Sequence, residues 1–283
     1  MLILQHDWAE AFTNNEGAWC TYKTTEKVIH GKVTKHHSTE FNVERKEKTI
    51  TISYDQTTTT FQQPDKWYNA DSFTHRFLDI SPNETLLVKS GANKVDVFDV
   101  ERHATRRQID TVTTPGLIRF FPSGQVLLVA DYNQLKVIDI ASGQVARTLI
   151  GHAGEVNQVA FLGPGRNIVS FSSDGTVHLW EMSAGVGETL IGGGHGPINT
   201  GCIVTAPTKV KCDKDNYFGN GDEFIWAGTE TGKIIGKRLF DEKLAYIEQL
   251  DGAINAMCSI DMQLFVGTQS GTLYRIVTND YQV

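Results

Sequence analysis

Short runs of alternating apolar and polar residues, separated by turn residues, recur along most of the chain. The clearest example begins at Gly151. Val156–Leu162 is followed by a Gly-Pro-Gly turn, Asn167–Ser172 is followed by an Asp-Gly turn, and Thr176–Trp180 comes next. Proline presets φ and glycine accepts a positive φ, so both turns favour hairpins. The stretch predicts an antiparallel meander of about forty residues, once an outer strand through Leu190 is included.

The same turns and strands recur, giving five units that begin near Thr74, Pro115, Glu155, Pro197 and Ala253. The fourth unit carries a polar insertion over Ala206–Glu223, and only about ten residues follow the last hairpin turn of the fifth. Four-stranded units at this period are typical of a WD-repeat β-propeller. We therefore predict an all-β fold with five recognisable blades, the last one incomplete, near residues 72–110, 111–150, 151–192, 193–250 and 251–283.

Residues 1–65 do not share this repeat. His6–Phe12 predicts a short helix capped by Asp7. Four alternating stretches, AWCTYK, KVIHGKVTK, FNVERK and TITISYD, predict a small β-meander. The threonine run and Pro64 within Gln56–Lys66 indicate the connection into the first blade. The predicted domains are an N-terminal β module (1–65), either separate or an extra blade-like sheet, and a propeller region (66–283).

The third unit has polar residues that the other units mostly lack: His152, Ser170 or Ser172, Asp174 and Trp180. In WD-repeat blades such residues form a buried hydrogen-bonded tetrad. A histidine, an aspartate and a serine could also form a catalytic set, but the spacing matches the structural tetrad strand by strand. We expect the structural role, because burial of His152 and Asp174 is tolerable when each satisfies the other. The position of Trp180 is occupied elsewhere by Phe98, Ile138, Lys237 and Ile276.

Three asparagines occupy equivalent positions at the start of the innermost strands of the third, fourth and fifth units: Asn157, Asn199 and Asn255. Arg76 holds this position in the first unit, and Glu155 lies beside it in the third. Asparagine is unfavourable in strands. The repetition therefore indicates either local capping of strand ends or a polar rim that binds a partner at one mouth of the propeller.

Composition narrows the possible functions. The net charge of −7 argues against a nucleic-acid-binding surface. No apolar run approaches the ~18 residues that a membrane span requires, and the N-terminus lacks the basic region of a signal peptide. The four cysteines lack paired short spacing, which predicts a reduced cytoplasmic or nuclear setting. Cys202 and Cys258 are predicted to be small buried core residues.

His30, His36 and His37 lack further ligands at zinc-site spacing, and no phosphate-binding loop is present, so we expect no metal and no cofactor.

Several segments together resemble the proteasomal ATPase-associated factor family, a WD-repeat family of the proteasome regulatory particle. They are HDWAEAF and EGAW near the N-terminus, RFFPSG (Arg119–Gly124), QLKVID (Gln134–Asp139), GRNIVSFSSDGTVHLW (Gly165–Trp180) and GTQSGTLY (Gly267–Tyr274). The repeat segments are shared by many WD-repeat proteins. The N-terminal Trp8 segment, in the same order as RFFPSG, is more specific.

The resemblance implies a non-catalytic assembly chaperone or regulator that binds the C-terminal domains of regulatory-particle ATPase subunits. It also implies a seven-bladed propeller, of which five blades are recognisable here. The alternative is a generic WD-repeat adaptor, such as a substrate receptor of a ubiquitin ligase, but the Trp-Asp-x-Arg box of such receptors is absent after Trp180 and Phe98. A propeller enzyme would need converging acids, metal ligands or a nucleophile, and the sequence indicates none.

Overall fold

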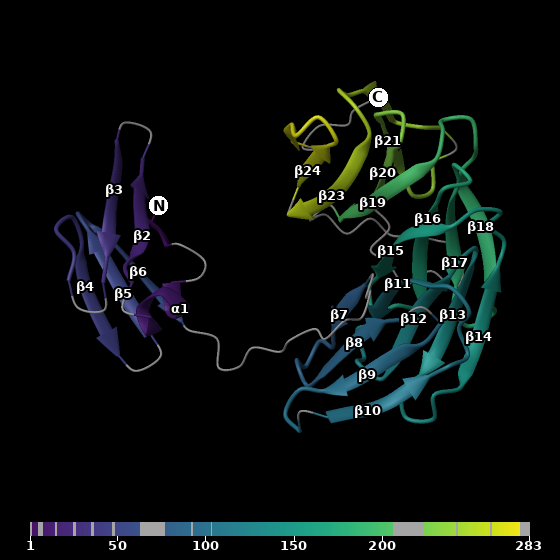
Figure 1. Cartoon of the computed structure of the whole chain (residues 1–283). Coiled ribbons are helices and arrows are strands. Elements are labelled where there is room, and N and C mark those ends of the chain that lie inside the picture. The colour runs from purple at the N-terminus through teal and green to yellow at the C-terminus, as the bar shows by residue number, and fades with distance from the viewer. Residues whose placement is uncertain are drawn as a thin grey trace. The chain divides into compact units, whose positions relative to one another are not determined.

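The computed structural model describes residues 2–4, 8–14, 16–24, 27–34, 37–46, 49–62, 77–91, 93–102, 104–205, 223–241, 243–260 and 262–277. The chain divides into two compact units, Met1–Ser72 and Phe73–Val283 (Figure 1). The boundary predicted at 65/66 and this division both fall within residues 63–76, which lie outside the described residues. Each unit is described separately below.

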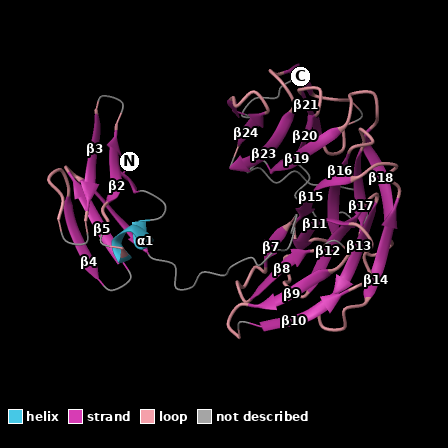
Figure 2. Ribbon diagram, in the orientation of Figure 1, coloured by secondary structure: helices cyan, strands magenta, loops and turns pink. Residues whose placement is uncertain are grey.

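The first unit contains two three-stranded antiparallel sheets and one short helix (Figure 2). One sheet has the order β1-β2-β3 and the other the order β4-β5-β6. Large apolar side chains from both sheets and from the helix share one buried cluster, which includes Phe12, Tyr22 and Ile52. The elements are β1 (Leu2–Leu4), α1 (Trp8–Thr13), β2 (Ala18–Lys23), β3 (Val28–Val33), β4 (Asn42–Lys46), β5 (Thr49–Tyr54) and β6 (Thr57–Gln62).

Two local expectations for this unit change. The helix begins at Trp8, and its predicted cap Asp7 lies outside the described residues. The segment predicted to be a connection is instead largely the strand β6, so that expectation was wrong. β-Branched threonines favour strands, and Asp55, at a φ of 54°, turns the chain so that β6 pairs with β5. Hydroxyl groups also pair across these strands, with 2.9 Å between Thr51 Oγ1 and Thr60 Oγ1.

The described residues of the second unit form five antiparallel sheets, each a meander of consecutive strands, and this confirms the five predicted blades. The first sheet contains β7 (Leu78–Ile80), β8 (Leu86–Ser90), β9 (Val95–Asp99) and β10 (Ala104–Ile109). The second contains β11 (Pro115–Phe120), β12 (Val126–Asp131), β13 (Gln134–Asp139) and β14 (Val145–Ile150). The third contains β15 (Val156–Leu162), β16 (Asn167–Ser172), β17 (Val177–Glu181) and β18 (Val186–Ile191). The fourth contains β19 (Ile198–Thr205), β20 (Glu223–Thr229), β21 (Lys233–Arg238) and β22 (Tyr246–Gln249). The fifth has three described strands, β23 (Ile254–Ile260), β24 (Gln263–Thr268) and β25 (Leu273–Val277).

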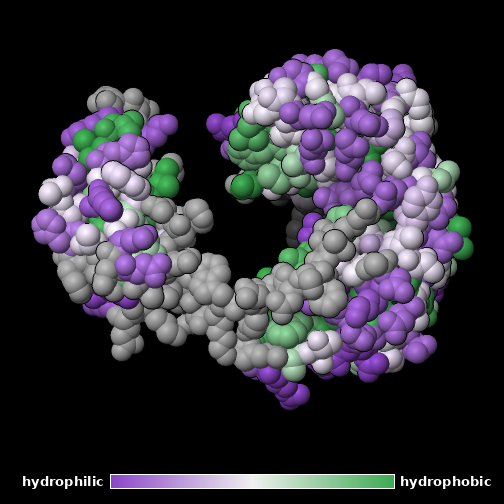
Figure 3. All heavy atoms as spheres, viewed as in Figure 1, coloured by the Kyte–Doolittle hydropathy of each residue, from purple (hydrophilic) through white to green (hydrophobic). Residues whose placement is uncertain are grey.

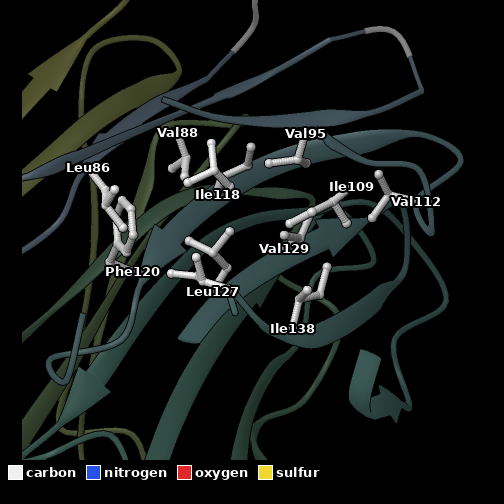
Figure 4. Packing of buried hydrophobic residues seen from close by; sticks show 12 residues of the cluster. Leu86, Val88, Val95, Ile109, Val112, Ile118, Phe120, Leu127, Val129 and Ile138 are labelled. Atoms are coloured by element: carbon white, nitrogen blue, oxygen red, sulfur yellow. The ribbon is translucent and has the colours of Figure 1, made fainter. Parts of the chain in front are cut away.

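Each pair of consecutive sheets encloses one apolar cluster. Between the first and second sheets, Val88 and Val95 pack with Ile118 and Leu127 (Figure 4). Trp180 belongs to the cluster between the second and third sheets, and Trp226 to the cluster between the fourth and fifth. Burial of apolar area at about 25 cal/mol per Å² is the main force that holds such layers together. The sheets are therefore stacked face to face, as propeller blades are.

The burial of the second strand of each sheet depends on the place of that sheet in the series. In β16 and β20 every residue is buried, because both faces are covered by neighbouring sheets. In β24, burial alternates along the strand. One face of the fifth sheet is therefore exposed, and it carries Ile260, Leu273 and Val277 at 61, 72 and 52% exposure. Hydrophobic surface gathers over this sheet in the space-filling view (Figure 3).

Candidate functional site

The hairpin turn between β16 and β17 is tied to the chain segment that precedes β15. The Nδ1 atom of His152 lies 2.9 Å from Oδ2 of Asp174, and its Nε2 atom lies 2.7 Å from Oγ of Ser170. The indole Nε1 of Trp180 donates to the same serine oxygen at 2.8 Å. The structure thus brings His152, Ser170, Asp174 and Trp180 into one hydrogen-bonded chain. Ser172, the alternative to Ser170, instead accepts from the backbone N–H of Asp174 at 3.2 Å.

The Asp174 carboxylate accepts more than the histidine bond. The backbone N–H groups of Ala153 and Thr176 donate to it at 2.8 Å each, and the Thr176 hydroxyl donates at 2.6 Å. Burial acts to raise the pKa of Asp174, but hydrogen bonds from Thr176, Ala153 and His152 outweigh burial and hold this pKa well below its usual range. The carboxylate is therefore charged at every physiological pH, and it holds the turn to the preceding segment.

Two histidines lie against each other beside this carboxylate. The rings of His152 and His178 are stacked, with 4.1 Å between their centroids. Burial lowers the pKa of His152, although Asp174 opposes the shift. Burial and the neighbouring His152 lower the pKa of His178 to about 4. Both imidazoles are therefore neutral near neutral pH.

The geometry favours stability rather than catalysis. His152, Ser170 and Trp180 are 4, 0 and 2% exposed, so a substrate has no approach to the serine oxygen. That oxygen already contacts both the histidine and the indole. A nucleophile needs an open position beside it for the reacting atom. The chain of hydrogen bonds instead satisfies polar groups that would otherwise be buried without partners.

Two related clusters were missed in the sequence. In the second sheet, the carboxylate of Asp131 accepts hydrogen bonds from the backbone N–H groups of Thr113 and Thr114. It also accepts one from Nζ of Lys136, at 2.5 Å. In the fifth sheet, Asp251 accepts hydroxyl groups that include that of Tyr274, at 2.6 Å. Each aspartate again ties the segment before a sheet to the hairpin of that sheet. Asp131 could have been found by comparing the acidic residues near the second hairpin turn of each unit. Asp251 could not be found in this way, because it precedes the first strand of its sheet.

The repeated asparagines lie at β-bulges, where the register of the innermost strand shifts. Asn157 of the third sheet donates its amide Nδ2 to the carbonyl oxygen of Ile198 in the fourth sheet, at 2.7 Å. Asn199 of the fourth sheet donates in the same way to Ile254 in the fifth, at 3.3 Å. Asn255 is exposed, and no partner among the described residues is recorded for its amide. Two of the three asparagines therefore connect consecutive sheets.

This arrangement predicts unequal effects of replacing the asparagines. Asn157→Ala and Asn199→Ala each remove a hydrogen bond between sheets and are expected to lower the free energy of unfolding by about 1 kcal/mol. Asn255→Ala is expected to change it by less than about 0.5 kcal/mol. Urea unfolding of the three variants measures the difference. Equal effects at all three positions would contradict the connecting role of Asn157 and Asn199.

The other predicted rim residues have different positions. Glu155 immediately precedes β15, is partly exposed, and accepts the backbone N–H of Ser173 through its carbonyl oxygen at 2.9 Å. Its side chain lies near Gly116 of the second sheet. Arg76 lies outside the described residues. Asn255, which is exposed, and Glu155, which is partly exposed, thus remain the candidates for contact with a partner.

The prediction that Cys202 and Cys258 are buried core residues was wrong for Cys258, whereas Cys202 packs against the apolar cluster between the fourth and fifth sheets. Cys202 is partly buried, and burial raises the pKa of its thiol to about 12. Cys258 is exposed. The reason lies in the sheet order, because Cys258 is on the open face of the fifth sheet, whereas Cys202 is on a face that the fifth sheet partly covers. Equivalent strand positions therefore differ in burial.

Comparison with known proteins agrees with this architecture. The family model "WD domain, G-beta repeat" matches residues 143–181, from the turn before β14 to the end of β17. An uncharacterised WD repeat-containing protein of Synechocystis sp. is 31% identical over 38% of this chain. The periodic tryptophan protein 2 homologue of Schizosaccharomyces pombe is 29% identical over 30% of the chain. The 26S proteasome regulatory subunit RPN14 of Saccharomyces cerevisiae is 33% identical over 24% of the chain.

The matches cover 32, 11 and 16% of these three relatives, in that order. Together with the five sheets they show a WD-type β-propeller fold, and WD repeats serve as protein-interaction modules. Among the described residues, no group of three or more histidine, cysteine or acidic side chains is placed to hold a metal ion. No helix in the described part of the chain is long and apolar enough to span a membrane.

Proposed function

We propose that this protein is a non-catalytic interaction module that binds the C-terminal domains of ATPase subunits of the proteasome regulatory particle. In this role it acts as an assembly chaperone or regulator in the cytoplasm or nucleus. The observation that carries the proposal is the combination of WD-type blades with sequence similarity to a proteasome regulatory subunit. The N-terminal Trp8 segment, in the same order as RFFPSG, supports the same assignment through its resemblance to the proteasomal ATPase-associated factor family.

The site for this partner is the mouth of the propeller at the start of the innermost strands. The proposed contacts are Glu155, which is partly exposed, Asn255, which is exposed, and Arg76. The net charge of −7 suits a basic partner surface. Electrostatic matching of that kind mainly speeds the encounter, and it weakens as salt screens the charges.

Binding to purified C-terminal domains of the regulatory-particle ATPases tests the proposal directly. The intact protein is expected to bind at least one of them, and Glu155→Lys is expected to weaken that binding about tenfold, or ~1.4 kcal/mol. Glu101→Lys makes the same charge change at an exposed turn of the first sheet and should bind normally. The asparagine pair Asn157 and Asn199 is unsuitable here, because its replacement also weakens the stack of sheets.

A pull-down from cell extract, read by mass spectrometry, separates this function from its alternative. Regulatory-particle ATPases in the captured material support the proposal. Cullin or other ligase subunits in their place would favour the WD-repeat adaptor of a ubiquitin ligase. Failure of the intact protein to bind any of the purified ATPase domains would overturn the proposal.

A further inference from the structure

The outer face of the first sheet in the N-terminal unit combines exposed apolar side chains with lysines. Side chains of β1, β2 and β3 alternate, so that Leu4, Cys20 and Val33 point into the core. The opposite positions form what is here called the Trp19 face. Its members are Ile3, Trp19, Thr21, Lys23, Val28, His30 and Lys32.

The Trp19 face exposes three apolar side chains, of which Ile3 lies diagonally across from Trp19, whereas Val28 lies opposite Lys23, nearer the other end of β2. Ile3, Trp19 and Val28 are 46, 56 and 56% exposed, and they lie on three neighbouring strands. Single exposed apolar residues are normal on a protein surface. Tryptophan is usually largely buried, however, and an exposed tryptophan with aliphatic neighbours is typical of a binding hot spot.

Contacts within the face hold the tryptophan in place. Trp19 and His30 meet edge to face, with 6.5 Å between ring centroids. Thr21 Oγ1 lies 2.9 Å from His30 Nδ1, which fixes the imidazole. The aliphatic part of Lys32, the cross-strand partner of Trp19, lies over Gly17, where any larger side chain would collide with it. The surface is therefore ordered before a ligand arrives, which reduces the entropy lost on binding.

The charges on this face have one sign. Lys23 and Lys32 are cationic, and none of the described members of the face is acidic. This contrasts with the net charge of −7 of the whole chain. A ligand that matches the face therefore carries a carboxylate to pair with the ammonium group of Lys32 and an apolar side chain to cover Trp19.

From these observations we infer that the Trp19 face binds an acidic peptide segment that contains an apolar side chain. Aromatic side chains and lysines also occur together in proteins that bind single-stranded nucleic acid. Such proteins neutralise many phosphates along a basic groove. Two lysines on an acidic chain fall short of that requirement, so the peptide is favoured.

Fluorescence anisotropy of the intact protein with a short fluorescein-labelled peptide tests this inference. The probe consists of glutamate and aspartate around a central leucine-phenylalanine pair. We expect saturable binding that weakens as salt is added, because salt screens the ammonium–carboxylate pairs. Trp19→Ala and Lys32→Glu are each expected to weaken binding about tenfold or more, as for hot-spot residues.

Lys46→Glu is the control for the charge change, because Lys46 is also an exposed strand lysine, on β4 of the other sheet, where its Nζ lies 3.7 Å from Oε1 of Glu44. This variant should bind the peptide like the unchanged protein. Lys32→Glu reverses a charge and keeps only part of the aliphatic chain over Gly17, so urea unfolding of both variants shows whether a loss of binding reflects a loss of stability. Absence of peptide binding, equal weakening by Lys46→Glu, or equally tight binding of a short single-stranded DNA would overturn the inference.

Discussion

Replacing Asp174 by alanine is expected to lower the free energy of unfolding by about 3 kcal/mol. The substitution removes the acceptor for His152 Nδ1, for the backbone N–H groups of Ala153 and Thr176, and for the Thr176 hydroxyl. Hydrogen bonds to a charged group contribute roughly 1.5–3 kcal/mol each, and bonds that share one acceptor are not additive. Urea unfolding, followed by circular dichroism, measures the loss.

Asp110→Ala provides the control, because Asp110 is an exposed aspartate just after β10 and should change stability by less than about 0.5 kcal/mol. Asp174→Asn keeps one acceptor oxygen and should fall between the two. If Asp174→Ala were as stable as the unchanged protein but no longer bound the partner, Asp174 would serve in recognition and not within the third sheet.

Stability is also expected to fall as the solution is acidified from about pH 7.5 to about pH 4.5. His178 has a pKa of about 4 in the folded protein, against an ordinary value of 6.5. Between these values the unfolded chain binds a proton that the folded chain excludes, so the free energy of unfolding decreases as pH falls. The expected decrease is about 2 kcal/mol, after allowance for partial exposure of the ring. His152 contributes with the same sign, because burial also lowers its pKa.

Urea unfolding at several pH values checks this expectation. His178→Gln removes the titrating group and should flatten the pH dependence, whereas His37→Gln, at an exposed turn of the N-terminal unit, should leave it unchanged. Asp174 does not contribute in this window, because its pKa is depressed and its protonation affects stability only below its ordinary value. If the free energy of unfolding of His178→Gln depended on pH as steeply as that of the unchanged protein, other groups would cause the acid sensitivity.

The strands of the second unit were predictable because their signals are local. Turn residues such as Gly124 and Gly175, both at positive φ, mark hairpins that chain neighbours alone can form. The tetrad was predictable for a related reason, since Ser170, Asp174 and Trp180 belong to one hairpin and His152 directly precedes the sheet. In the N-terminal unit, the threonine-rich strand β6 was missed because its apolar and polar alternation is weak.

The role of the asparagines could not be read from the sequence. Along the chain, the rest of the third sheet separates Asn157 from its partner Ile198. Their hydrogen bond forms only because the innermost strands of the third and fourth sheets lie side by side. Asn199 donates a hydrogen bond to Ile254, which follows the polar insertion in the sequence. A repeated position indicates a shared environment, but it does not say whether the side chain meets solvent, a partner protein or the next sheet.

By itself, the sequence determined the strand order within the sheets of the second unit, the five repeats and the residues of the tetrad, because hairpins and alternation act over a few residues. Only the tertiary structure decided which faces are buried. Cys202 and Cys258 occupy equivalent positions, yet one is covered and the other exposed, and Trp19 emerged as part of a cationic surface only when β1, β2 and β3 aligned. Burial depends on what packs against a strand, and those partners lie far away along the chain.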